Sequence, residues 1–299
     1  MKALSASHRE NIFPMTSNHI TSKVGKSMKH LWLVLIICML ATTTLSGCLL
    51  GVNYRKDAYR ENQLFPDKYL ELAVREALHK PEGKILKRDL KKITELTDND
   101  SFSRLVNLEG IQRLTNLEEL YITGGHIEDL TPLRNLQKLR VLEVGQNNIQ
   151  DIAPLANLAN LEQLDVRSNR IRDITPLGKL TNLRYLNIRL NKIENLDPLG
   201  NLTNLETLEM SSNRVKDIAA LRNLTNLKEL SASCNSIKDI TALRNLHKLG
   251  VLDIRSNNVT NIEPISNLNN LGVLFIEGNP IKDYSPLEKL RNDHNVEIR

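Results

Sequence analysis

The 299-residue sequence predicts an α/β solenoid in which the short strands of successive coils pair side by side in one parallel sheet. Two observations support this prediction. Residues 114–287 contain eight repeats with a fixed period of 22 residues, and apolar residues recur at the same places in every repeat. A coil of 22 residues cannot enclose its own apolar side chains, so the coils must stack and cover one another.

Each repeat follows the consensus Leu-x-x-Leu-x-Leu-x-x-Asn-x-Ile-x-Asp-Ile-x-Pro-Leu-x-x-Leu, which is the signature of leucine-rich repeats. In its Leu-x-Leu segment, strand alternation points the leucines inward and the intervening residues outward. We expect the asparagine to bond the backbone of neighbouring coils, as one member of a ladder. Gly125 takes this place in the first repeat. The asparagines of the ladder are Asn147, Asn169, Asn191, Asn213, Asn235, Asn257 and Asn279.

The second half of each repeat carries proline or alanine at one fixed place. Proline in so short a segment favours extended chain or a 3₁₀ turn over an α-helix, because proline lacks the N–H that a helix interior needs. We therefore expect a 3₁₀ or extended side opposite the sheet. The prolines are Pro132, Pro154, Pro176, Pro198, Pro264 and Pro286, and the alanines are Ala220 and Ala242.

Residues 63–113 predict a helical N-terminal cap followed by a degenerate first coil. Apolar residues at helical spacing indicate a helix over 65–78, and a second short helix over 85–93 leads into a strand near 93–96. At the other end, residues 288–299 predict a C-terminal cap with a closing strand. The degenerate coil keeps the 22-residue register through Leu105, Leu108, Ile111 and Leu114.

The first 47 residues predict a signal peptide that ends at a lipidation site. Lys29 precedes an apolar run over 31–45, which is short for a membrane span. The run ends in Leu-Ser-Gly-Cys, which resembles the lipobox of bacterial lipoproteins. This resemblance implies that the chain is cut before Cys48 and that Cys48 carries lipid. A plain signal peptide and an anchor helix are the alternatives.

Lipid on Cys48 implies a location in the bacterial cell envelope, on the outer face of the cell membrane, or in the outer membrane of a Gram-negative cell. Residues 48–62 show little apolar periodicity and predict a flexible tether between the lipid and the repeats. Translation from Met28 would give a signal peptide of ordinary length, so Met28 is an alternative start.

The charge and the cysteines exclude two classes of function. Of 40 basic and 35 acidic residues, five basic and one acidic lie in 1–47, which leaves 35 against 34 in the remainder. The exported part therefore lacks the excess of positive charge that binding to nucleic acids requires. Cys38, Cys48 and Cys234 are too scattered for a disulfide framework or a metal site, so we expect no metal and no other cofactor. Cys234 is interpreted as a half-buried small residue in a turn.

The order of helices, strand and 22-residue repeats over 63–299 resembles the internalin family of bacterial surface proteins. It is also similar to the repeat class of the eukaryotic protein phosphatase 1 regulatory subunits. The resemblance implies a curved right-handed solenoid that binds a macromolecule, most simply a protein, through its concave face. Unlike invasive internalins, the chain has a lipobox and lacks both LPxTG and an immunoglobulin-like region after the repeats. We therefore do not expect a role in host invasion.

Strand alternation identifies the side chains of the concave face. Arg167 and Arg189 lie on neighbouring strands, while Val251, Val273 and Phe275 predict an exposed apolar cluster near the C-terminal end. Aromatic residues and arginine are common interface anchors. Alternatively, the arginines only pair with neighbouring acids. The candidate partner-binding residues are Tyr121, Glu143, Asp165, Arg167, Tyr185, Arg189, Val251, Arg255, Val273 and Phe275.

The sequence offers no catalytic constellation, so we expect a non-enzymatic protein. HExxH, GxSxG, P-loop and GxGxxG motifs are absent, and no repeat leaves the period to insert a catalytic loop. A monomeric surface protein that binds a protein partner is the favoured function. The alternatives are a structural or regulatory scaffold for the cell's own envelope proteins and a cytosolic phosphatase-regulator-like protein, which a functional signal peptide would exclude. The histidines of the exported part share no motif and are His79, His126, His247 and His294.

Overall fold

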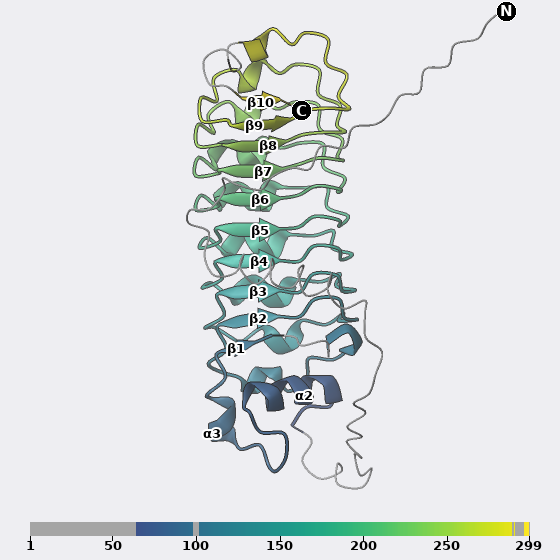
Figure 1. Ribbon diagram of the computed structural model, residues 1–299, viewed down its shortest axis with the longest axis vertical. Helices are drawn as coiled ribbons and strands as arrows, with labels where there is room; N and C mark the ends of the chain where they lie inside the picture. The colour runs from purple at the N-terminus through teal and green to yellow at the C-terminus, as the bar shows by residue number, and fades with distance from the viewer. Residues whose placement is uncertain (1–63, 98–101, 289, 291–295, 299) are drawn as a thin grey trace, which may run out of the picture. The chain divides into compact units, whose positions relative to one another are not determined.

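The computed structural model describes residues 64–97, 102–288, 290 and 296–298 (Figure 1). All of them belong to the unit Tyr59–Arg299. The expected signal peptide, the lipidation site Cys48 and the tether lie outside the described residues. No helix in the described part of the chain combines the length and the apolar character that a bilayer span requires.

Short strands pair in chain order into one parallel sheet, shown as the stack of arrows in Figure 1. From β2 to β9, partner residues are 22 positions apart, as in the row of Leu142, Leu164 and Leu186, whereas β1 and β10 pair at a spacing of 24. Equal coil length therefore produces an in-register sheet, and the predicted leucine-rich-repeat solenoid is confirmed. The strands are β1 (Glu95–Leu96), β2 (Glu119–Tyr121), β3 (Val141–Glu143), β4 (Gln163–Asp165), β5 (Tyr185–Asn187), β6 (Thr207–Glu209), β7 (Glu229–Ser231), β8 (Val251–Asp253), β9 (Val273–Phe275) and β10 (Glu297–Ile298).

The inner side of the sheet covers a continuous aliphatic core. In the coil of β5, Leu183, Leu186 and Ile188 are all 0% exposed, and the equivalent residues of the other coils belong to the same cluster. Each buried aliphatic side chain contributes roughly 1.5–3 kcal/mol to folding. Because the coils on either side supply the cover, the stability of each coil depends on its neighbours.

The asparagine column joins each coil to the coil before it. The side-chain amide of Asn169 donates to the carbonyl oxygens of Val144 and Val166, both at 3.0 Å. Its Oδ1 accepts the backbone N–H of Ile149 at 2.9 Å. The same three kinds of bond recur at Asn147, Asn191, Asn213, Asn235, Asn257 and Asn279.

Gly125 ends this column at the first repeat for a steric reason. A Cβ atom at Gly125 would lie 2.8 Å from the carbonyl oxygen of Phe102 and 3.0 Å from Oδ1 of Asn147. An asparagine side chain therefore has no room where the degenerate coil approaches this turn.

One residue in each turn, directly before the asparagine column, has a left-handed backbone. The φ angle is 56° at Leu190 and 55° at Cys234, a conformation that is strained for residues with a Cβ atom. Gly124 and Gly278 provide the same conformation in the first and last turns without that strain. The remaining members of this column are Gln146, Ser168, Ser212 and Ser256.

A 3₁₀ helix follows the turn in the coils of β2 to β8, as the prolines predict, and these helices lie behind the strands in Figure 1. An Asx turn precedes each helix; for example, Asp173 Oδ1 accepts the N–H of Thr175 at 2.8 Å. Coils with Ala220 or Ala242 in place of proline also form the 3₁₀ helix, so the Asx turn is sufficient to begin it without proline. The helices are η3 (Thr131–Leu133), η4 (Ala153–Asn157), η5 (Thr175–Lys179), η6 (Asp197–Asn201), η7 (Ala219–Asn223), η8 (Thr241–Leu243) and η9 (Glu263–Ile265).

In the described residues before the repeats, the chain forms the α-helices α2 (Lys68–Ala77) and α3 (Lys87–Leu90). Asp67 begins α2, because its Oδ1 accepts the N–H of Tyr69 at 2.9 Å. Its other oxygen accepts the N–H of Val106 at 3.0 Å, so the same carboxylate ties the helix to the degenerate coil. That coil contains the 3₁₀ helices η1 (Phe102–Arg104) and η2 (Ile111–Arg113).

At the C-terminal end, residues 286–288 are helical, which the sequence pattern did not indicate. Pro286 suits the first position of a helix, where its missing N–H would have no partner. The strand at this end is confined to β10, which pairs with β9.

Replacing Asn191 by alanine would leave the buried N–H of Ile171 and the carbonyls of Val166 and Ile188 without these partners. We expect Asn191→Ala to lower the free energy of unfolding by about 2–4 kcal/mol, because buried polar groups are costly when unpaired. Equilibrium urea unfolding measures this loss.

Asn182→Ala is the matched control for this measurement. Asn182 is exposed, and its side chain donates one bond, to the carbonyl oxygen of Ala159. We expect a loss below about 1 kcal/mol, since water replaces that bond. Equal losses in the two variants would contradict the structural role of the Asn191 column.

Candidate functional site

The outward side chains of the strands form a surface that we call the sheet face. Three positions of each coil contribute to it: the first and third residues of the strand and the second residue after it. Because these positions alternate with buried leucines, the core pattern leaves them free to vary between coils. The sheet face comprises Glu119, Tyr121, Thr123, Val141, Glu143, Gly145, Gln163, Asp165, Arg167, Tyr185, Asn187, Arg189, Thr207, Glu209, Ser211, Glu229, Ser231, Ser233, Val251, Asp253, Arg255, Val273, Phe275 and Glu277.

Asp165 was predicted to be a surface contact residue, but its exposed fraction is only 3%. Arg167 covers it, with Nη1 at 2.5 Å from Asp165 Oδ2, and the N–H of Arg167 donates to Oδ1 at 2.9 Å. The side-chain amide of Asn187 approaches the same carboxylate at 3.3 Å. Asp165 therefore holds Arg167 in place and is not itself accessible to a partner.

Burial raises the pKa of three carboxyl groups on the sheet face. Desolvation is the largest cause for Asp165, and hydrogen bonds from Arg167 only partly oppose it. Desolvation also raises the pKa of Glu143, and the negative charge of Asp165 raises it further. The pKa of Glu209 is raised by desolvation against the opposing charge of Arg189. The centre of the sheet face thus holds acids that are poorly solvated.

Two tyrosines of the sheet face are half-buried and remain neutral. The hydroxyl of Tyr121 donates to Glu119 Oε2 at 2.7 Å. Burial, followed by that bond, raises the Tyr121 pKa. Burial raises the pKa of Tyr185 to about 12, and the Asn187 side chain donates to its hydroxyl at 3.3 Å.

The three arginines predicted to bind a partner differ in their surroundings. Arg167 and Arg255 are each paired with the acid two residues earlier, and Arg255 Nη2 lies 2.7 Å from Asp253 Oδ2. Arg189 is exposed and has no ion pair within 4.0 Å among the described residues. Of these three arginines, Arg189 alone has an exposed side chain that forms no ion pair with a described residue.

The predicted exposed cluster of Val251, Val273 and Phe275 is instead half-buried. Val251 and Val273 are direct cross-strand neighbours and cover each other. The guanidinium of Arg255 lies 4.7 Å from the centre of the Phe275 ring, which shields one face of the ring. The predicted exposure was wrong because strand alternation shows only that a side chain points away from the core. Side chains on adjacent strands cover part of its surface.

Leu190 is the residue that the sequence analysis missed. It is 46% exposed and occupies the left-handed turn position directly after Arg189. Other coils have polar residues, cysteine or glycine there, so comparison along this column would have revealed it. Cys234 lies in the same column and is exposed, which corrects its interpretation as half-buried.

A second missed feature is the edge of the sheet at the strand starts, where charges alternate from coil to coil. We call it the paired edge. Glu162 accepts a bond from Arg140 at 2.9 Å, while Glu206 pairs with both Arg184 and Lys228. Hydrogen bonds from these cations lower the pKa of Glu162 and Glu206. The column is Glu118, Arg140, Glu162, Arg184, Glu206 and Lys228.

Within the described residues, no three His, Cys, Asp or Glu side chains converge as metal ligands would. The arrangement instead provides a row of arginine, tyrosine and apolar side chains on a rigid sheet, which is suited to binding.

Comparisons with known families agree with this architecture. A family model described as leucine-rich repeat region matches residues 144–292, and one described as leucine rich repeat matches residues 115–171. No curated protein sequence matches the chain.

Solved structures give a more specific relationship. Internalin C2 from Listeria monocytogenes has a TM-score of 0.69 and 37% identity, over 71% of this chain and 94% of that one. A leucine-rich-repeat protein of Leptospira interrogans has a TM-score of 0.60 and 28% identity, over 65% and 51%. The functional domain of InlJ from Listeria monocytogenes has a TM-score of 0.61 and 23% identity, over 76% and 54%, and shows the fold alone. Because the similarity to internalin C2 extends over nearly the whole length of that chain, this protein belongs to the internalin-like family of leucine-rich-repeat proteins.

Proposed function

We propose that this chain is a lipid-anchored protein of the bacterial cell surface that binds a protein partner through the sheet face, without catalysis. The observation that carries the proposal is the continuous, in-register sheet, which places the outward residues of all coils on one surface. At about 4.8 Å per strand the sheet is roughly 40 Å wide. This width accommodates an interface of about 800 Å² per partner, which is typical of specific complexes.

The region around β5 has the properties of a binding hot spot. Arg189 is exposed, Tyr185 is half-buried at the start of β5, and Leu190 exposes an apolar side chain. Arginine and tyrosine are enriched at interface hot spots. A partner that covers an exposed leucine stabilises the complex, because apolar surface is removed from water. These three residues therefore form the proposed anchor.

The desolvated acids provide a second argument. Glu143 and Glu209 have raised pKa values because burial disfavours their charged forms. A charged carboxylate in that position destabilises the free protein at neutral pH. Groups held at such a cost are candidates for function, since a partner that donates hydrogen bonds to them relieves the desolvation.

We expect Arg189→Glu and Leu190→Asn each to weaken partner binding about tenfold or more, which is the scale of a hot-spot residue. Asparagine tolerates the left-handed turn, so Leu190→Asn should not lower the melting temperature. Crosslinking on intact cells identifies the partner by mass spectrometry, and calorimetry with the purified partner then gives Kd for each variant.

Lys179→Glu is the control for these variants, because Lys179 is exposed at the end of η5, away from the sheet. It should leave Kd unchanged. Unchanged affinity in both sheet-face variants would exclude the β5 region as the anchor. A partner from the cell's own envelope would indicate a scaffold, and one from a host extract an adhesin.

Glu143→Gln should raise the melting temperature at pH 7. The pKa of Glu143 in the folded protein lies above its ordinary value of about 4.3, so the folded state binds the proton more tightly. Stability therefore falls as pH rises from about 4 through the folded-state pKa, and the full penalty remains at neutral pH. Thermal unfolding between pH 4 and pH 7 measures this dependence.

Glu162→Gln provides the opposite case, because hydrogen bonds from Arg140 lower the Glu162 pKa. Its stabilising contribution is present above the unfolded pKa, so this variant should be slightly less stable than the wild type at pH 7. A lower melting temperature for Glu143→Gln at pH 7 would refute the desolvation argument.

Lipidation is tested by labelling cells with radioactive palmitate. Cys48→Ala should abolish the label and move the chain out of its lipid-anchored fraction, whereas Cys38→Ala should retain the label, because only Cys48 follows the Leu-Ser-Gly sequence. Label that persists in Cys48→Ala would contradict the anchor. An unlabelled wild-type chain in the cytosol would favour the cytosolic regulator.

A further inference from the structure

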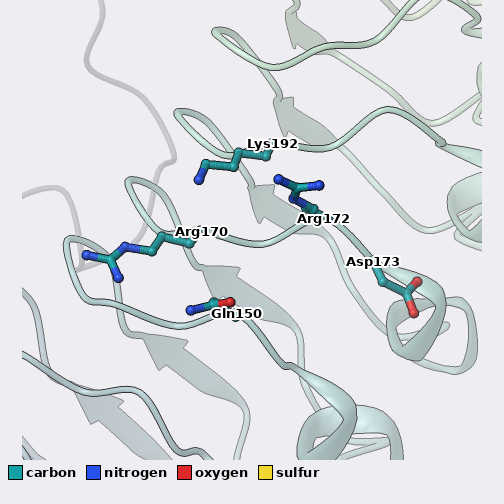
Figure 2. A pocket seen from close by; sticks show the side chains of 5 residues that line it. All are labelled: Gln150, Arg170, Arg172, Asp173 and Lys192. Carbon is teal, nitrogen blue, oxygen red and sulfur yellow. The ribbon is translucent and has the colours of Figure 1, made fainter.

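A hollow of about 490 Å³ opens at the side of the coils where the chain leaves the strands (Figure 2). Its lining comes from the loops after β3, β4 and β5. The lining residues are Gln150, Arg170, Arg172, Asp173 and Lys192.

The three cations of this hollow are not neutralised. Arg170, Arg172 and Lys192 form no ion pair within 4.0 Å with any described residue. The one acid in the lining, Asp173, accepts the N–H of Thr175 at 2.8 Å, and Figure 2 shows its carboxylate turned away from the cations. Lys192 is half-buried, whereas Arg170 and Arg172 are exposed. The hollow therefore has an excess of positive charge.

Several cations elsewhere beside the sheet pair with an acid. On the paired edge, Arg140, Arg184 and Lys228 each contact a glutamate. One coil beyond the hollow, Arg214 lies 3.7 Å from Glu194. The hollow thus gathers three cations that have no ion pair with a described residue, whereas the cations of the paired edge are neutralised.

The backbone fixes the spacing of these side chains. The N–H of Arg170 donates to the carbonyl of Ile149, and the N–H of Lys192 donates to the carbonyl of Ile171, both at 2.8 Å. These bonds join consecutive coils, so the two cations stand one coil apart on a rigid support. Figure 2 shows their side chains directed to the same side, with Arg172 reaching toward the Lys192 loop.

We propose that this hollow binds a phosphate group of an anionic ligand. Guanidinium groups present paired N–H donors that match phosphate oxygens, and a lysine adds a third positive charge. The phosphate group belongs either to a soluble phosphate compound or to a phospholipid headgroup. This site is separate from the sheet face, so it does not depend on the proposed protein partner.

The test uses the full-length chain in non-ionic detergent and isothermal titration calorimetry. The probes are pyrophosphate, glycerophosphoglycerol as a soluble phospholipid headgroup, and citrate as a polycarboxylate. The test variant is Arg170→Gln with Lys192→Gln. The control is Arg184→Gln with Lys228→Gln, which removes the same charge from the paired edge. Circular dichroism verifies that both variants are folded.

We expect at least one phosphate probe to bind more tightly than citrate. Its affinity should fall about tenfold or more in the test variant and less than about twofold in the control, because only the test variant loses charge-assisted bonds to the ligand. Binding of pyrophosphate alone identifies soluble phosphate as the source, and preference for glycerophosphoglycerol identifies the headgroup. Equal losses in the two variants, citrate binding as tight as phosphate binding, or no binding of either phosphate probe would overturn the proposal.

Discussion

The hydrogen bonds of the asparagine column are the constraint on which the rest of this structure depends. A 22-residue coil must turn sharply after each strand, and the turn removes backbone groups from water that the coil cannot pair alone. Asn169 resolves this by donating to the carbonyls of Val144 and Val166 and accepting from Ile149. Each coil therefore completes the one before it, and no coil is stable without a neighbour.

This coupling keeps the coils at one length, and the constant length aligns the strands. The turn that positions the asparagine also forces the preceding residue into a left-handed backbone, with φ between 54° and 59° in the six residues other than glycine. Leu190 occupies this strained place with an exposed apolar side chain. The scaffold thus displays an apolar side chain outside its own core, next to Arg189, which has no ion pair among the described residues.

Charges are distributed differently over the three surfaces of the coil. On the paired edge, glutamates and cations alternate from coil to coil and neutralise one another. On the sheet face, acids such as Glu143 are partly desolvated, and burial raises their pKa. At the hollow near Arg170, three cations form no ion pair with any residue that the structure describes. A uniform backbone repeat therefore carries three electrostatically distinct surfaces, because the residues between the core positions are free to vary.

The sequence by itself determined the solenoid, the asparagine column and the 3₁₀ helices. These features follow from periodic spacing along the chain, since a 22-residue period with inward leucines permits only coils that stack in register. It also identified which strand residues point outward. Only the tertiary structure decided which of them are accessible. Arg167 covers Asp165, Arg255 covers Phe275, and Arg189 remains open. Adjacent strands are about 4.8 Å apart, so a long side chain on one strand can cover a residue on the next. The two residues are 22 positions apart in the chain, and the sequence pattern does not show which side chains reach across.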